Sequence, residues 1–159
     1  MRIGFGYDVH QFAPSRPLWL GGIVVPSELG LMGHSDADVL IHALCDALLG
    51  AANLRDIGYH FPDTAGNEYE GIDSKILLRR VMDMLHQKGY RLGNCDCTIC
   101  AQTPKLSPYI PEMQRCLAEV MAVDTDCVSI KATTTEHLGF VGRKEGISAY
   151  AVVLIESNI

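Results

Sequence analysis

Apolar and polar side chains alternate along several stretches of this chain. Such alternation places successive side chains on opposite faces of an extended backbone, so it predicts strands over residues 3–10, 91–101, 127–134 and 147–156. Two short apolar runs, 18–20 and 23–25, are separated only by Gly21-Gly22. This arrangement predicts a hairpin with a two-residue turn.

Other stretches repeat apolar residues at helical spacing. An apolar run over 39–49 follows the N-cap signal of Ser35 and Asp38 and predicts a first helix. A second helix is predicted between Asp73 and the stop signal Gly89. A third is opened by a proline and carries Met113, Leu117, Val120 and Met121. The order of elements predicts an α+β fold, a mixed β-sheet with helices packed on one face.

Length and composition indicate one globular domain over residues 1–159, because 48% of the residues are hydrophobic and 20% are charged. The formal net charge of −6 has the wrong sign for a surface that binds a nucleic acid, although a small phosphorylated ligand stays compatible with it. The chain shows neither a membrane-spanning apolar run nor a targeting signal. We therefore expect a cytoplasmic protein.

Six cysteines are present, and three of them, Cys95, Cys97 and Cys100, are close together. In a strand, Cys95 and Cys97 share one face and Cys100 takes the other, so the three thiols do not converge on one metal ion. We interpret them as reduced thiols, with small core side chains favoured over a zinc site.

The first predicted helix carries polar residues at intervals of four. Asp38, His42 and Asp46 share one stripe of an otherwise apolar segment. From spacing alone, a functional stripe and a narrow solvated face are equally compatible with this pattern.

Asp8 and His10 project from one face of the first strand, and with His42 they form a candidate ligand set. Two imidazoles and one carboxylate suit Zn²⁺ and leave its fourth position open, as in catalytic sites. An Asp-x-His pair also occurs by chance, and a single histidine on a helix is often structural. The spacing therefore leaves both interpretations open.

Two further polar segments follow predicted strands. Residues 133–136, Thr-Thr-Thr-Glu, offer hydroxyls and a carboxylate that can hold phosphate oxygens and a hard cation, or can cap a turn. Residues 101–106 follow the preceding strand and can be an ordinary loop. Neither segment alone specifies a ligand, and the chain lacks the usual glycine-rich nucleotide motifs.

Several motifs in the same order resemble the 2-C-methyl-D-erythritol 2,4-cyclodiphosphate synthase family, the cyclases of the non-mevalonate isoprenoid pathway. The matching segments are Gly6-Tyr7-Asp8-Val9-His10, Gly33-His34-Ser35-Asp36-Ala37-Asp38-Val39, His42-Ala43, Asp46-Ala47-Leu48-Leu49-Gly50-Ala51, Asp56-Ile57-Gly58, Phe61-Pro62-Asp63-Thr64, Lys131-Ala132-Thr133-Thr134-Thr135-Glu136 and Gly139-Phe140.

The resemblance implies a homotrimer with its sheets around a three-fold axis and with active sites at subunit interfaces. It implies a cyclase (a phosphorus–oxygen lyase) that converts 4-diphosphocytidyl-2-C-methyl-D-erythritol 2-phosphate into 2-C-methyl-D-erythritol 2,4-cyclodiphosphate and CMP. One Zn²⁺ per subunit is implied, together with Mg²⁺ or Mn²⁺ when substrate is bound. It also implies an axial channel that can take an isoprenoid diphosphate.

The resemblance further implies a role for each matching position. Zinc would be bound by Asp8, His10 and His42, and the second cation by Glu136. His34, Thr134 and Glu136 would be catalytic. Substrate would be contacted by Asp8, His10, His34, Ser35, Asp56, Ile57, Gly58, Phe61, Asp63, Ala101, Pro104, Lys105, Leu106, Thr133, Thr134, Thr135, Glu136, Phe140 and Arg143.

Two rival functions use the same residues. A zinc-dependent hydrolase of a nucleotide diphosphate would need a general base, and Asp38, Asp46 and Glu136 are the candidates. A noncatalytic trimeric nucleotide-binding protein would tolerate loss of zinc ligands, whereas this sequence retains all three.

Overall fold

The computed structural model describes residues 1–64 and 66–158 and contains one five-stranded sheet. Its strands lie in the order β4 (Gly30–Leu31), β1 (Arg2–Ala13), β7 (Gly146–Ser157), β5 (Tyr90–Cys100) and β6 (Val128–Thr133). The pair β5 and β6 is parallel, and the other neighbouring pairs are antiparallel. The predicted mixed sheet is therefore confirmed.

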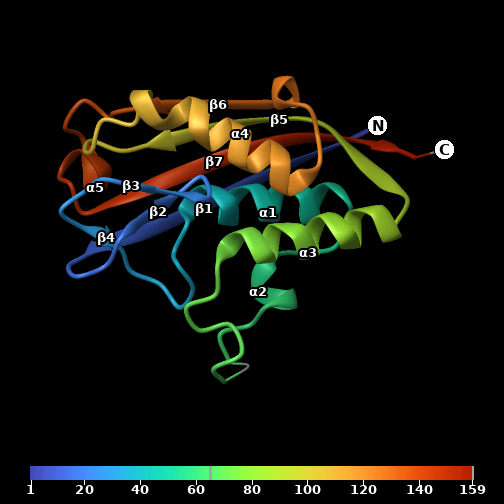
Figure 1. Ribbon diagram of the computed structural model, residues 1–159, viewed down its shortest axis with the longest axis horizontal. Helices are drawn as coiled ribbons and strands as arrows, with labels where there is room; N and C mark the ends of the chain where they lie inside the picture. Colours follow the sequence, from blue (N-terminus) through green and yellow to red (C-terminus); the bar gives the residue numbers. More distant parts are fainter. Residues whose placement is uncertain (65, 159) are drawn as a thin grey trace.

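The long helices pack on one face of this sheet, as the sequence predicts (Figure 1). Three helices are long, namely α1 (Val39–Ala51), α3 (Ser74–Gln87) and α4 (Ile110–Met121). Two single-turn helices are α2 (Ile57–His60) and α5 (Gly139–Gly142), and two 3₁₀ turns are η1 (Ser107–Tyr109) and η2 (Thr125–Cys127). The short elements β4, α2 and α5 are absent from the sequence prediction because a few residues carry no periodicity.

Glycines on β1 let α1 lie very close to the sheet. A Cβ atom at Gly4 would overlap the carbonyl oxygen of Ala47, and one at Gly6 would overlap that of Ala43. Gly4 and Gly6 lie on the same face of β1 as Asp8 and His10. The helix is therefore held directly beside both polar side chains.

The opposite face of the sheet leaves apolar side chains exposed. Ile3 is 75% exposed and Phe5 is 62% exposed, and the side chains of Tyr7, Val9, Tyr150 and Val152 on β1 and β7 are also exposed. A contiguous apolar surface of this kind is typical of a protein–protein interface.

The predicted hairpin is present, with β2 (Leu18–Leu20) pairing with β3 (Ile23–Val25). Gly21 and Gly22 have φ angles of 63° and 81°, a conformation that other residues rarely adopt. The predicted faces of the cysteines are also confirmed, because Cys95 and Cys97 are buried in the core whereas Cys100 is partly exposed on the other side of β5. Among the described residues, no helix has both the length and the apolar character to span a membrane.

Candidate metal centre and substrate cavities

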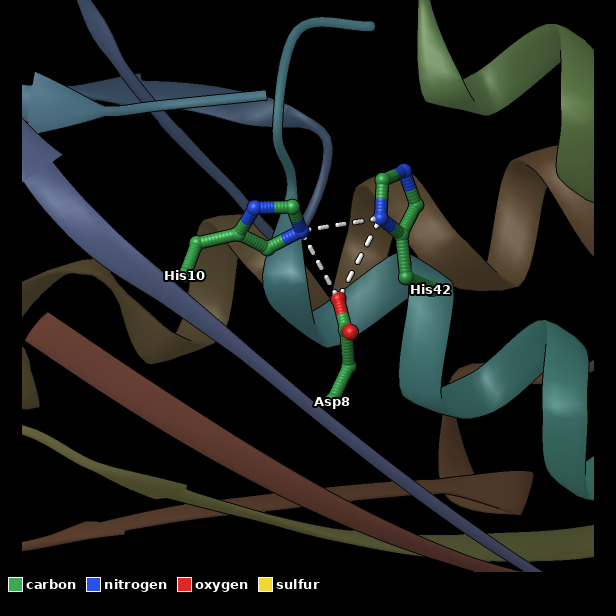
Figure 2. A group of neighbouring side chains, drawn as sticks. All are labelled: Asp8, His10 and His42. Carbon is green, nitrogen blue, oxygen red and sulfur yellow. Dashed lines mark hydrogen bonds and ion pairs between the residues drawn. The ribbon is translucent and has the colours of Figure 1, made fainter. Parts of the chain in front are cut away.

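Asp8 and His10 from β1 and His42 from α1 point toward one another (Figure 2). All three residues line one cavity. The carboxylate Oδ2 of Asp8 lies 2.9 Å from Nε2 of His10 and 3.2 Å from Nδ1 of His42. The two imidazole nitrogens are 3.3 Å apart. Three potential ligand atoms thus form a nearly equilateral triangle, and among the described residues these side chains are the group that could hold a metal ion.

The triangle fits a tetrahedral metal ion. Ligand atoms at about 2.0–2.2 Å from such an ion are separated by roughly 3.3–3.6 Å. The Oδ2 atom of Asp8 is buried and accepts no hydrogen bond from the described residues, despite the two nearby ring nitrogens. An unsatisfied buried carboxylate oxygen beside two imidazole nitrogens is accounted for by a cation shared among them.

The electrostatics of the triad favour an ionised carboxylate. Burial by itself raises the pKa of Asp8, but the contacts with His10 and His42 outweigh it and bring the pKa to about 2. Burial lowers the pKa of His10, and the Asp8 carboxylate more than reverses this, so the net shift is upward. A positive charge is therefore favoured at this position, which a divalent cation would supply.

The distal nitrogen of His10 is also held in place. Nδ1 of His10 lies 2.7 Å from the carbonyl oxygen of Met32 and donates to it. Nε2 then carries the free lone pair and faces the triangle. This hydrogen bond orients the imidazole as a ligand.

The cavity beside the triad has a volume of about 400 Å³. Its lining includes Asp8, His10, His34, Ser35, His42, Ile57, Gly58, Phe61 and Asp63, which are predicted site residues from four separate parts of the chain. Nε2 of His34 is buried there without a hydrogen-bond partner among the described residues, so it is available to a ligand.

The polar stripe of Asp38, His42 and Asp46 is not a solvated face. Asp38 is fully buried and accepts hydrogen bonds from the backbone N–H groups of Gly21, Gly22 and Ile41. It therefore caps α1 and holds the hairpin turn against the helix. Burial and the nearby Asp36 raise the pKa of Asp38, and these three donors offset part of that effect.

Asp46, one turn beyond His42 on α1, is half-buried and accepts from the backbone N–H of Ile57 at 2.9 Å. This contact holds α2 in place, and its residues Ile57 and Gly58 form part of the cavity lining. Asp56 is the N-cap of α2 and accepts from the N–H of Tyr59. The sequence singled out Asp46 by its spacing but did not indicate this positioning role.

A second cavity, of about 420 Å³, lies elsewhere on the same chain. Its lining includes the predicted residues Ala101, Pro104, Lys105, Leu106, Thr133 and Thr134. Thr135 and Phe140 line a third hollow, which also contains Tyr7 and Tyr150. Glu136 is exposed after β6, and Arg143 is exposed and pairs with Glu145. On this chain, the predicted residues are therefore divided between separate cavities.

Comparison with known proteins identifies the family. The sequence profile of the YgbB family matches residues 1–156. The chain belongs to the YgbB family. A YgbB relative, the 2-C-methyl-D-erythritol 2,4-cyclodiphosphate synthase of Parabacteroides distasonis, is 69% identical over 98% of this chain and 96% of the relative. The synthase of Bacteroides thetaiotaomicron is 65% identical over 99% of each chain.

Solved structures agree with this YgbB assignment. The bifunctional IspDF of Campylobacter jejuni has a TM-score of 0.94 at 42% identity, and the match covers 98% of this chain and 42% of that longer one. IspF of Plasmodium falciparum, solved as a CDP complex, has a TM-score of 0.87 at 32% identity, with 99% and 97% of the two chains covered. The resemblance drawn from sequence motifs is confirmed.

Three residues near the site were not predicted to act there. Asp36 and Ser74 contact each other beside His42, and Arg16 donates to the backbone oxygens of Gly33 and Ser35. Asp36 belongs to a quoted motif and Ser74 to a helix start, but no local pattern links either residue to His42.

Proposed function

We propose that this protein cyclises 4-diphosphocytidyl-2-C-methyl-D-erythritol 2-phosphate to 2-C-methyl-D-erythritol 2,4-cyclodiphosphate and releases CMP. The observation that carries the proposal is the convergence of Asp8, His10 and His42 on one point in the lining of a cavity, in a member of this family. The CDP complex of a similar protein supports a cytidine nucleotide as part of the substrate.

We propose Zn²⁺ as the ion held by Asp8, His10 and His42, since two imidazoles and one carboxylate are a typical set for zinc with an open position. When bound, the ion supplies Lewis-acid stabilisation of phosphate charge and a template for the substrate. Asp8 contributes the negative charge of the set, and the hydrogen bond from His10 to Met32 keeps one ring in the required orientation.

The reaction needs no nucleophile from the protein, because the attacking 2-phosphate oxygen belongs to the substrate. The protein must fold the substrate so that this oxygen lies in line with the β-phosphate, and must keep water out. In the triad cavity, His34, Ser35 and Asp63 are proposed to bind the methylerythritol phosphate, while Asp56 and Gly58 contact the ribose. A largely apolar part of the cavity lining is proposed to limit the access of water, and it is formed by Ile57, Phe61, Tyr69, Ile72 and Leu77.

The second cavity is proposed to receive the cytosine base through Ala101, Pro104, Lys105 and Leu106. Thr133 and Thr134, which also line it, are proposed to contact the nucleotide phosphates. Glu136 follows at once and is proposed to hold Mg²⁺ or Mn²⁺ between the α- and β-phosphates, because such ions prefer carboxylate oxygens.

We propose a homotrimer in which each active site combines the triad cavity of one subunit with the cytosine cavity of its neighbour. Two observations support this assembly. The predicted substrate residues are divided between two cavities on one chain, and the face of the sheet opposite the long helices exposes Ile3, Phe5 and Val152. The axial channel for an isoprenoid diphosphate, with Arg143 among its lining residues, stays a prediction.

The hydrolase alternative has less support. A general base for water activation must be free to accept a proton near the metal. Asp38 is buried with three backbone donors, and Asp46 accepts from Ile57. Both carboxylates therefore have structural partners.

Product analysis tests the proposal directly. The purified protein with Zn²⁺ and Mg²⁺ is incubated with the diphosphocytidyl substrate, and products are identified by ³¹P NMR and mass spectrometry. We expect the cyclic diphosphate and CMP in equal amounts. Linear hydrolysis products would instead support the hydrolase, and unchanged substrate would support a binding protein.

A further inference from the structure

The imidazole of His42 is contacted on the side away from the triad by a buried serine. Nε2 of His42 lies 3.0 Å from Oγ of Ser74, which is fully buried at the start of α3. The hydroxyl of Ser74 in turn donates to Oδ1 of Asp36. A chain of hydrogen bonds thus runs from a proposed metal ligand to a carboxylate.

The direction of these hydrogen bonds follows from the geometry. Nδ1 of His42 faces Asp8 and His10, so it must keep its lone pair to serve as a ligand. Nε2 then carries the proton and donates it to Oγ of Ser74, and the Ser74 hydroxyl can donate only to Asp36. Oγ of Ser35 is a longer alternative acceptor at 3.2 Å, and it already accepts from the N–H of Ala37.

Asp36 is itself firmly positioned. Its Oδ2 accepts from the backbone N–H of Ser74 at 2.9 Å, and its Oδ1 accepts from the backbone N–H of Asp38 at 3.1 Å. These contacts connect the carboxylate to the first turn of α3 and to the N-cap of α1. The carboxylate therefore holds the Ser74 hydroxyl at one place relative to the helix that carries His42.

We propose that Asp36 and Ser74 are positioning residues that select the tautomer of His42 and orient its ring for the metal ion. The inference rests on the proposed metal at Asp8, His10 and His42 and extends it to the residues behind the ligands. A carboxylate at the end of the chain also makes the imidazole a better electron donor. Loss of such contacts typically weakens metal affinity about 10–100-fold.

The test measures zinc retention by the metal-loaded protein against a chromogenic chelator at pH 7.5. Ser74→Ala and Asp36→Asn should each lower zinc affinity about 10-fold or more relative to the unaltered protein. Asp73→Asn is the matched control, because Asp73 also caps the first turn of α3 but through the N–H of Lys75. The zinc affinity of Asp73→Asn should change less than about twofold, although this substitution weakens the N-terminal cap of α3, as Asp36→Asn also does.

A spectroscopic readout separates positioning from general loosening of the helix. In the zinc-loaded protein, the Nε2 proton of His42 should give a slowly exchanging NMR signal. In Ser74→Ala this signal should disappear or the proton should exchange much faster, whereas in Asp73→Asn the signal should be retained. Equal zinc affinity in all three variants would overturn the proposal, and so would an unchanged proton signal in Ser74→Ala. If Ser74→Ala does not fold, Asp36→Asn decides by the same two measurements.

The outcomes also separate this inference from the proposed reaction. A protein that retains zinc, responds to these substitutions and lacks cyclase activity refutes the reaction alone. A protein that cyclises substrate normally while the substitutions leave zinc retention unchanged refutes the positioning role alone. Failure of the unaltered protein to bind zinc overturns the positioning role whatever its activity.

Discussion

At the scale of single residues, His42 joins the first strand to the first helix through the metal site. Its side chain is buried, whereas the rest of α1 is covered by apolar residues that pack independently of it. Removing the imidazole should therefore affect metal binding far more than folding. Arg16 acts at the same scale, because its guanidinium holds the backbone of the loop that carries His34 and Ser35.

We predict that His42→Ala loses zinc and lowers the cyclisation rate on the order of 10³-fold, since a Lewis acid supplies several kcal/mol of charge stabilisation. The secondary structure should remain. Metal analysis, circular dichroism and the rate measurement check this, with His86→Ala at the exposed end of α3 as the control. Zinc at full stoichiometry in His42→Ala would contradict the ligand assignment.

Arg16→Ala should keep zinc but lower turnover about 10-fold and the free energy of unfolding by about 2 kcal/mol, because two charge-assisted hydrogen bonds are lost. Their N–O distances are 2.8 Å to Gly33 and 2.7 Å to Ser35. Urea unfolding and steady-state kinetics measure the two effects. Arg80→Ala, on the exposed side of α3, is the control and should change neither. Normal turnover in Arg16→Ala would show that the loop holds its shape without this residue.

At the scale of elements, the close contact between β1 and α1 places the metal ligands. Gly6 has no side chain where α1 crosses, and Asp8 is the next residue on the same face of β1. Asp38 and Asp46 then connect α1 to the β2–β3 hairpin and to α2. This helix therefore carries His42 and also holds α2, whose residues Ile57 and Gly58 line the triad cavity.

Gly6→Ala should lower the free energy of unfolding by about 3 kcal/mol or more, because the new methyl group overlaps the backbone of α1 and the helix must move. Zinc affinity should fall with it. Gly50→Ala is the matched control within α1, since among the described residues no heavy atom lies within 4 Å of a Cβ placed there. The free energy of unfolding of Gly50→Ala should rise by about 0.5–1 kcal/mol, because alanine has a higher helix propensity than glycine. Equal urea midpoints for both variants would show that the approach of α1 to β1 is looser than described.

At the scale of the whole molecule, the proposed substrate residues are divided between two cavities, which supports the proposed assembly with a second subunit. The exposed apolar side chains of β1 and β7 are the surface that we propose for that contact. A ring of three such subunits contains three equivalent interfaces, each with one triad cavity and one cytosine cavity.

Mixing two inactive variants should restore activity. His42→Ala damages the triad cavity, and the double variant Lys105→Glu/Thr134→Val damages the cytosine cavity. In randomly mixed trimers at equal amounts, roughly a quarter of the interfaces combine two intact halves, so about a quarter of the activity should return. Native mass spectrometry must show that subunits have exchanged. Mixed trimers without activity would mean that each site is contained in one chain.

Local pattern was enough to predict the long elements and the candidate ligands. Strand alternation and helical spacing depend on neighbours within a few residues, so β1, α1, α3, β5, α4 and the β2–β3 hairpin were predicted with small errors at their ends. Asp8 and His10 share a strand face for the same reason. The motifs around these residues identify the family without any knowledge of the geometry.

Tertiary structure decided which of these side chains meet. The distance from His42 to Asp8, the hydrogen bonds of Asp38 to the hairpin, and the chain from His42 through Ser74 to Asp36 join residues on different elements. No periodic pattern specifies such contacts, because they depend on how closely α1 and α3 pack against each other and the sheet. The short helix α2 is likewise held by Asp46, a residue of another helix. Short-range patterns in the sequence thus specify the long elements and the kinds of ligand, and packing specifies the site that these residues form.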